Sequence, residues 1–154
     1  MTRSAFSPLT IGPLTLRNRF IKSATNEGMA PGGIPSRALV EHHRAIAAGG
    51  AAMTTVAYCA VSADGRTFED QIHLHRGILP HLRALTDAVH AHGAAACAQI
   101  THGGAFTFLK QLSTRYPLSA SGGFNAVGVV SGRLLRTQMD AAQMELVTQQ
   151  FVDG

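Results

Sequence analysis

A glutamine, a histidine and two glycines stand together at residues 99–104, directly after an apolar run at residues 94–98. The run predicts a buried strand of a parallel sheet, and ligands of α/β proteins bind at the carboxyl ends of such strands. Gln99 can donate and accept hydrogen bonds to a planar heterocycle, and glycines let a ligand approach the backbone. The alternative is a tight turn after a strand, with His102 exposed. These residues alone leave both interpretations open.

The composition indicates a globular chain. Of the 154 residues, 45% are hydrophobic and 14% are charged, which excludes disorder and is enough to build a core. The net charge of +4 rests on 13 basic residues that are scattered along the chain. Arg17, Arg19 and Lys22 come nearest to a cluster, which disfavours nucleic-acid binding because that function needs a basic patch.

Cysteines and histidines offer little support for a metal site. Cys59 and Cys97 lie in apolar runs without zinc-binding spacing, which predicts a reduced, buried pair in a cytosolic protein. None of the eight histidines forms an i, i+4 helical pair, so a small metal-binding module is only the third hypothesis. The sequence has no signal-like amino terminus and no membrane-spanning apolar run, which predicts a soluble, cytoplasmic protein.

Strand and helix patterns alternate along the chain. A Gly-Pro turn predicts a small hairpin at 10–16, and the polar, turn-rich segment 103–137 predicts a functional loop or small inserted elements. Asp140 and Gln143 predict a capping box before a helix whose apolar stripe holds Leu146, Val147, Phe151 and Val152. Between these come a strand at 18–24, a helix from Ser36 to the glycines at 49–50, a strand at 52–61, a helix ending at Gly93 and the strand at 94–98.

This order predicts βαβ units in a parallel sheet. No GxGxxG follows the first strand and no P-loop is present, so a doubly wound nucleotide-binding sheet lacks its fingerprint. The expected fold is the N-terminal portion of a (β/α)8 TIM barrel, with a short N-terminal hairpin capping the barrel bottom. Because such a barrel needs about 250 residues, we expect the fold to be incomplete here, either as a fragment or as a piece completed by association.

Five segments then occur in the order found in one enzyme family. They are 6–20, 20–30, 61–66, 99–104 (QITHGG) and 117–121 (PLSAS), and the helix at 140–153 follows them. Together they resemble the old yellow enzyme family of NAD(P)H:flavin oxidoreductases, which includes enzymes like 2,4-dienoyl-CoA reductase. The resemblance covers the whole chain, so residues 1–154 are expected to be the N-terminal part of one FMN-binding barrel domain.

The resemblance implies FMN across the carboxyl end of the barrel, with its isoalloxazine ring against the first strands. Gln99 would bond the pyrimidine edge of the ring. Asn26 stands where family members usually place the Thr or Cys that tunes the flavin potential, and Ala24 stands where several carry proline. No catalytic residue is expected within this chain, and His102 is not the family's catalytic histidine. The expected cofactor contacts are Ser23, Ala24, Thr25, Asn26, Ala57, Tyr58, Gln99 and His102.

The implied function is that of an FMN-dependent ene-reductase. Such an enzyme takes hydride from NADH or NADPH and reduces an activated alkene through flavin N5, and the chain alone is expected to be inactive because the catalytic motifs come later. The expected partners are a small-molecule alkene and either further copies of the chain or the missing C-terminal part, with no nucleic acid or membrane. The alternative is a non-catalytic half-barrel that self-associates and binds no flavin.

Overall fold

The computed structural model describes residues 4–154, and its centre is a parallel sheet built around one long strand. That strand, β4 (Met53–Ala60), pairs with β6 (Ala95–Thr101) from Met53 to Val56 and again at Cys59 and Ala60. Its other edge is shared by β3 (Ile21–Lys22) near its start and β5 (Ile72–His73) near its end. All these pairs are parallel, as the alternating pattern predicts.

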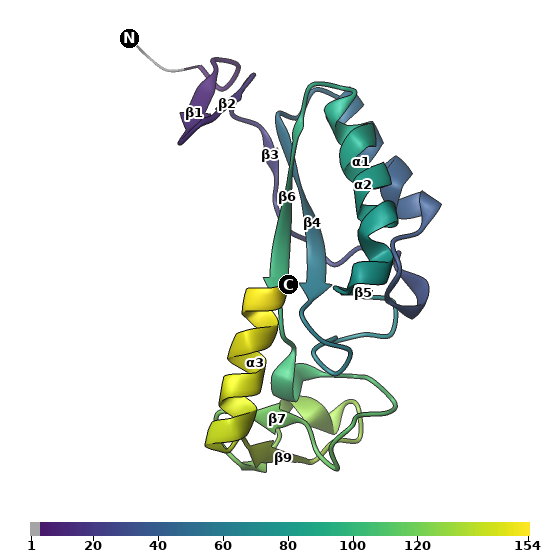
Figure 1. Ribbon diagram of the computed structural model, residues 1–154, viewed down its shortest axis with the longest axis vertical. Helices are drawn as coiled ribbons and strands as arrows, with labels where there is room; N and C mark the ends of the chain where they lie inside the picture. The colour runs from purple at the N-terminus through teal and green to yellow at the C-terminus, as the bar shows by residue number, and fades with distance from the viewer. Residues whose placement is uncertain (1–3) are drawn as a thin grey trace.

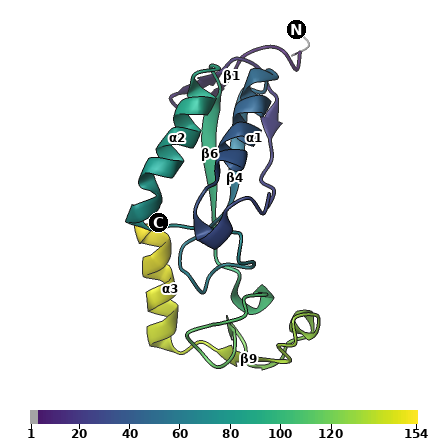
Figure 2. The same cartoon turned by 90° about the vertical axis from the view of Figure 1, so that its right-hand side faces the viewer.

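Two helices cover one face of this sheet and lie side by side in both views (Figures 1 and 2). They are α1 (Arg37–Ala48) and α2 (Leu79–His90), and short 3-10 turns precede both (Pro31–Gly33 and Arg76–Ile78). Ser36 caps α1 by accepting a hydrogen bond from the Leu39 amide, as predicted. The core between sheet and helices includes Leu39, Val56, Cys59, Leu85 and Val89. Burial of these apolar side chains holds the two layers together.

A hairpin lies at the end of the sheet where the strands begin (Figure 1). It is formed by β1 (Leu9–Ile11) and β2 (Leu14–Leu16), which pair antiparallel, so the predicted hairpin is confirmed. Arg17 follows it and donates to the carbonyl oxygens of His92 (2.8 Å), Ala47 (2.7 Å) and Ala51 (2.9 Å). Carbonyls near helix ends lack intrahelical partners and carry partial negative charge, so one guanidinium ties the hairpin to the ends of both helices.

Small elements gather beyond the opposite end of the sheet (Figure 1). The predicted inserted elements are a 3-10 turn (Gly104–Phe106) and a three-stranded sheet with the order β7-β9-β8. Its strands are β7 (Leu118–Ser119), β8 (Gly123–Phe124) and β9 (Leu135–Gln138), with a turn at Val127–Val129 between the last two. The chain then forms α3 (Ala141–Asp153), where the Asp140–Gln143 capping box is confirmed.

The first sheet strand is shorter than predicted: a strand was expected at 18–24, and β3 contains only Ile21 and Lys22. Asn18 forms a turn instead: its Oδ1 accepts from the Phe20 amide, and its Nδ2 donates to the Gly50 carbonyl. The paired register with β4 ends at Lys22. A strand pattern alone does not reveal how many of its residues find a partner.

The strand predicted at 94–98 is present, but the prediction that it is buried is wrong. Cys97 and Ala98 are exposed, as are Gln99 and Ile100 after them. Within the described residues β6 pairs only with β4, and Ala96 is its member that packs against the helix-covered core. The two cysteines are therefore not a buried pair, because Cys59 is buried and Cys97 is exposed.

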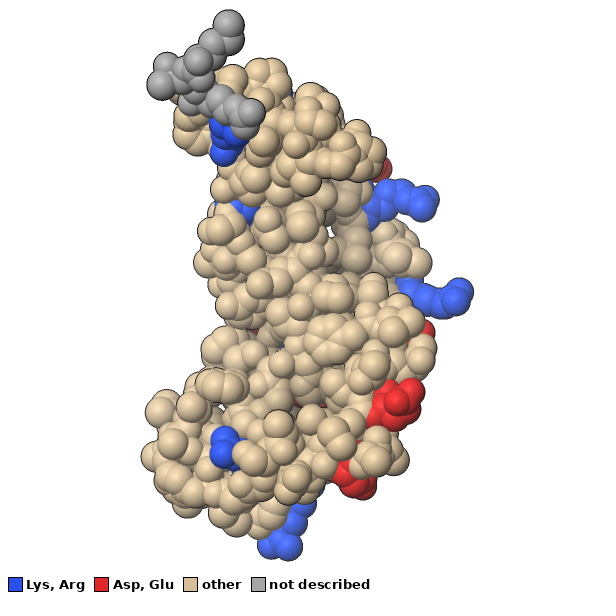
Figure 3. Space-filling view, turned by 90° about the vertical axis from the view of Figure 1, so that its left-hand side faces the viewer, with Lys and Arg blue, Asp and Glu red and all other residues tan. Residues whose placement is uncertain are grey.

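Charged side chains are sparse on one face of the molecule. On the face seen in Figure 3, the Lys and Arg side chains lie apart from one another on a largely uncharged surface. Among the described residues, every helix is too short or too polar to traverse a bilayer.

Candidate functional site

The sheet register places two of the predicted segments opposite each other. Val56 pairs with Ala98 and Cys59 with Ile100, so residues 57–58 of β4 lie opposite Gln99 of β6. The third segment, residues 23–25, follows β3 on the other side of β4, where the pairing ends at Lys22 and Thr54. β4 and β6 end together, at Ala60 and Thr101, and a ligand of a parallel sheet is expected at that end.

The middle of these segments departs from regular strand geometry. The pairing of β4 with β6 shifts register between Val56 and Cys59, so Ala57 and Tyr58 lie outside the regular ladder. Such irregularities often occur beside binding sites because they redirect the backbone. Ala57 is only 4% exposed, so its backbone rather than its methyl group would face a ligand, whereas Tyr58 is half-buried.

The polar groups at this edge suit the rim of a planar heterocycle. Gln99 is exposed, and it faces away from the helices because Ala96, three residues earlier on the strand, packs against their core. Thr25 adds a hydroxyl near the Ser23 carbonyl, at 3.5 Å. Asn26 Oδ1 accepts from the Gly28 amide at 3.3 Å and bends the chain there. Amides and a hydroxyl provide both donors and acceptors, which is the donor set that a flavin ring edge requires.

His102 and the glycines after it order the loop that follows β6. His102 Nδ1 accepts from the Gly104 amide at 3.1 Å, and burial lowers the pKa of its ring, which keeps it neutral. The Gly103 amide donates to the Gly65 carbonyl at 2.7 Å, and a Cβ at Gly103 would lie 2.8 Å from Thr67 Oγ1. Gly103 therefore lets the loops after β4 and β6 pack against each other.

A buried ion pair beside the first segment was missed by the sequence analysis. Lys22 Nζ pairs with Glu27 Oε1 and donates to the Thr55 carbonyl at 3.2 Å. The Glu27 side chain is 5% exposed, its Oε2 has no partner among the described residues, and His42 Nε2 lies 3.9 Å from Oε1. The available signal was a lysine in an apolar strand with a glutamate five residues later, but outside a helix that spacing does not indicate a contact.

His43 joins α1 to β4 beneath the same region. Its Nδ1 lies 2.7 Å from Thr54 Oγ1, and both residues are buried. Burial, with the nearby charge of Lys22, lowers the pKa of His43 to about 4. The histidine is therefore a neutral core residue. Within the described chain, no group of three or more His, Cys, Asp or Glu residues could hold a metal ion.

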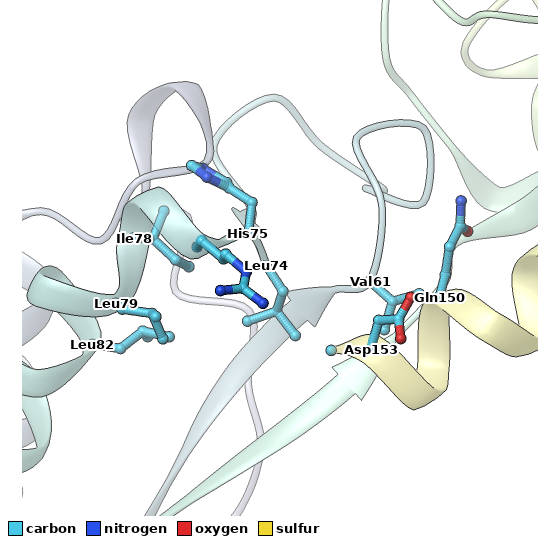
Figure 4. A pocket seen from close by; sticks show the side chains of 10 residues that line it. Val61, Leu74, His75, Ile78, Leu79, Leu82, Gln150 and Asp153 are labelled. Carbon is cyan, nitrogen blue, oxygen red and sulfur yellow. The ribbon is translucent and has the colours of Figure 1, made fainter.

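A cavity formed by the described residues lies away from these segments. It measures about 670 Å³ and opens between the start of α2 and the end of α3 (Figure 4). Leu74, Ile78 and Leu82 lie on one side, and Gln150 and Asp153 lie on the other. None of the predicted flavin contacts lines it, so the cavity is separate from the carboxyl edge described above.

Comparisons with proteins of known sequence agree on one family. The model of the NADH:flavin oxidoreductase / NADH oxidase family matches residues 4–154. The chain is 51% identical over 136 residues to the 4,4'-dithiodibutanoate disulfide reductase of Rhodococcus erythropolis, covering 87% of this chain and 34% of that protein. It is 34% identical over 97 residues to the multifunctional alkene reductase/demethylase OYE of Caballeronia cordobensis, covering 62% of this chain and 14% of that protein.

Solved structures show the same fold. Morphinone reductase in complex with tetrahydroNAD superposes with a TM-score of 0.83 at 18% identity, over 97% of this chain and 44% of that one. Old Yellow Enzyme from Pichia sp. AKU4542 gives 0.85 at 14% identity, over 97% and 41%. The chain thus spans about a third of the first curated relative and under half of these structures, and its fold is that of part of their TIM barrel. By its sequence it belongs to the NADH:flavin oxidoreductase / NADH oxidase family, that of the old yellow enzymes.

Proposed function

We propose that residues 4–154 hold the isoalloxazine ring of FMN in an NAD(P)H-dependent reductase. The observation that carries this proposal is that residues 57–58 of β4 lie opposite Gln99 of β6, with residues 23–25 following β3 on the other side of β4. Family membership supports the choice of a flavin over other planar ligands. When bound, FMN supplies the hydride chemistry, and the chain supplies binding and polarity.

Each segment has a distinct task in this proposal. The Gln99 amide donates to the pyrimidine edge of the ring, where negative charge accumulates on reduction. Thr25 and Asn26 offer further polar groups beside the first strand, and the backbone at Ala57 and Tyr58 forms the floor. His102 lies beyond this level and contributes through the loop that it orders.

Flavin binding tests the proposal directly. FMN added to the purified protein should be bound, with changes in its visible absorption and fluorescence. Gln99→Leu should weaken FMN binding about fivefold through the loss of one hydrogen bond, and it should make the reduction potential of bound FMN more negative. Gln111→Leu is the matched control, because Gln111 is also exposed and lies in the later loop. A protein that forms a defined oligomer and takes up no FMN would instead support the non-catalytic half-barrel.

The proposed substrate is an activated alkene such as an enone. The relative from Caballeronia cordobensis, described as an alkene reductase, supports this class. An organic disulfide is the second candidate, because the relative with 51% identity is described as a disulfide reductase. Because the chain alone is expected to be inactive, NADH and NADPH oxidation is measured on this chain joined to the remaining part of a family barrel. Its rates with cyclohexenone and with 4,4'-dithiodibutanoate distinguish the two candidates, and turnover of neither compound in that FMN-loaded protein would contradict both.

A further inference from the structure

A second concave site lies beside the loop that follows β6. It is a cleft of about 300 Å³ between that loop, the three-stranded sheet and α3. Its polar lining residues are His102, Ser119 and Arg136, and its apolar lining includes Phe106, Met139 and Val147. No acidic residue is among those that line it. The cleft therefore joins a cation and neutral polar groups to a hydrocarbon wall.

Arg136 is the unusual member of this set. Its Nη2 donates to Ser121 Oγ at 3.2 Å, which is the one hydrogen bond that its side chain forms with described residues. Its Nε is buried and has no partner there. The ion pairs formed within residues 4–154 use other cations, namely Lys22, His42 and Arg44. A guanidinium is always charged, so a half-buried one without a counter-ion is poised to receive an anion.

The neighbouring groups select the kind of anion. His102 uses Nδ1 as an acceptor from the Gly104 amide, so its neutral ring carries its proton on Nε2 and can act as a donor. Phe106, Met139 and Val147 offer contact to a hydrocarbon chain, which an inorganic anion would leave unused. A carboxylate with a short hydrocarbon chain uses both parts of the cleft.

We propose that this cleft binds the carboxylate end of a small organic anion, with Arg136 as the counter-charge. His102 links the cleft to the proposed flavin edge, because it stands three residues after Gln99 on the same strand and its following loop. As a substrate-anchoring site, the cleft rests on the proposed function and implies that the reductase acts on molecules with an acidic tail. Anion binding itself does not depend on flavin.

Pentanoate and its neutral counterpart pentanamide test the cleft in the purified protein. NMR should show pentanoate shifting the Met139 and Val147 methyl signals and the Arg136 Nε signal, and pentanamide should not bind measurably. Arg136→Met should weaken pentanoate binding at least about tenfold. Arg115→Met should bind like the unchanged protein, because Arg115 is exposed and stacks on Tyr116 outside the cleft.

Several outcomes would overturn the proposal. They are equal binding of pentanoate and pentanamide, unchanged affinity in Arg136→Met, or shifts confined to other residues. The comparison of acid with amide in the unchanged protein decides the question even where Arg136→Met fails to fold. FMN absorption recorded on the same samples separates the two proposals: bound FMN without pentanoate binding removes only this one, and pentanoate binding without FMN removes only the proposed function.

Discussion

Glu27 and Lys22 bind the chain segment after β3 to the sheet, at the position from which residues 23–26 would contact a flavin. The pair is largely buried, and Lys22 also donates to the Thr55 carbonyl of the neighbouring strand. Burial of an ion pair adds little net stability, but removal of one partner leaves the other charge buried and unpaired. We therefore expect a single substitution of this pair to lower the free energy of unfolding more than substitution of both residues.

Glu27→Ala should lower the free energy of unfolding by about 3 kcal/mol, because the Lys22 ammonium loses its counter-charge. The double variant Glu27→Ala/Lys22→Met should recover much of that loss, since no buried charge remains. Urea denaturation of the single and double variants measures both effects. Glu41→Ala is the control, because its pair with Arg44 is exposed and its loss should not be measurable. A Glu27→Ala variant as stable as Glu41→Ala would contradict the prediction.

His43 predicts a pH dependence of stability. Its pKa is about 4 in the folded chain and about 6.5 when unfolded, so between these values only the unfolded state binds the proton. The contribution of His43 is therefore fully present above about pH 6.5 and is lost toward pH 4, at about 1.4 kcal/mol per pH unit. The unfolding free energy, measured by denaturation at several pH values in this range, should rise less steeply with pH for His43→Gln. The difference in slope should correspond to one proton, about 1.4 kcal/mol per pH unit. Identical slopes for both proteins would rule out this assignment, since contributions from other histidines cancel in the difference.

At the element scale, local signals predicted the helices well and the short strands poorly. The side chains of Ser36 and Asp140 cap the starts of α1 and α3, so these helix boundaries can be predicted from the sequence. The strands β3 and β5 hold two residues each, and their existence depends on β4 lying beside them. The local sequence around β3 or β5 does not show that β4 will pair with it.

Arg17 connects elements that the sequence separates, and its loss should loosen them together. Arg17→Met removes three hydrogen bonds to carbonyls near the ends of α1 and α2, which should cost about 2 kcal/mol of unfolding free energy. Amide hydrogen exchange should show faster exchange in the hairpin and at both helix ends. Arg83→Met, on the exposed side of α2, should change neither quantity. Protection lost in the hairpin alone would show that Arg17 does not bridge the helices.

For the whole molecule, the parallel order of the strands was predictable from the sequence, whereas the surroundings of the candidate flavin contacts were not. Parallel strands align their carboxyl ends, so placing Gln99 after one strand and Ser23 after another was enough to expect them at one edge. The Arg136 cleft draws its lining from separate segments between residues 102 and 147, and no single motif or period joins them. The exposure of β6 likewise depends on which elements reach it, because the same apolar sequence would be buried if both of its faces were covered.

The unequal exposure of the two cysteines gives a test of this arrangement. Cys59 is fully buried between sheet and helices, and burial raises its pKa to about 12, so almost none of it is thiolate at about pH 8. Cys97 lies exposed on β6 and should react with iodoacetamide under the same conditions. Mass spectrometry of the native protein should show one alkylated cysteine per chain, located at Cys97, and Cys97→Ser should remain unlabelled. Two labels would mean that the helices do not seal the sheet, and no label would mean that β6 is covered in solution.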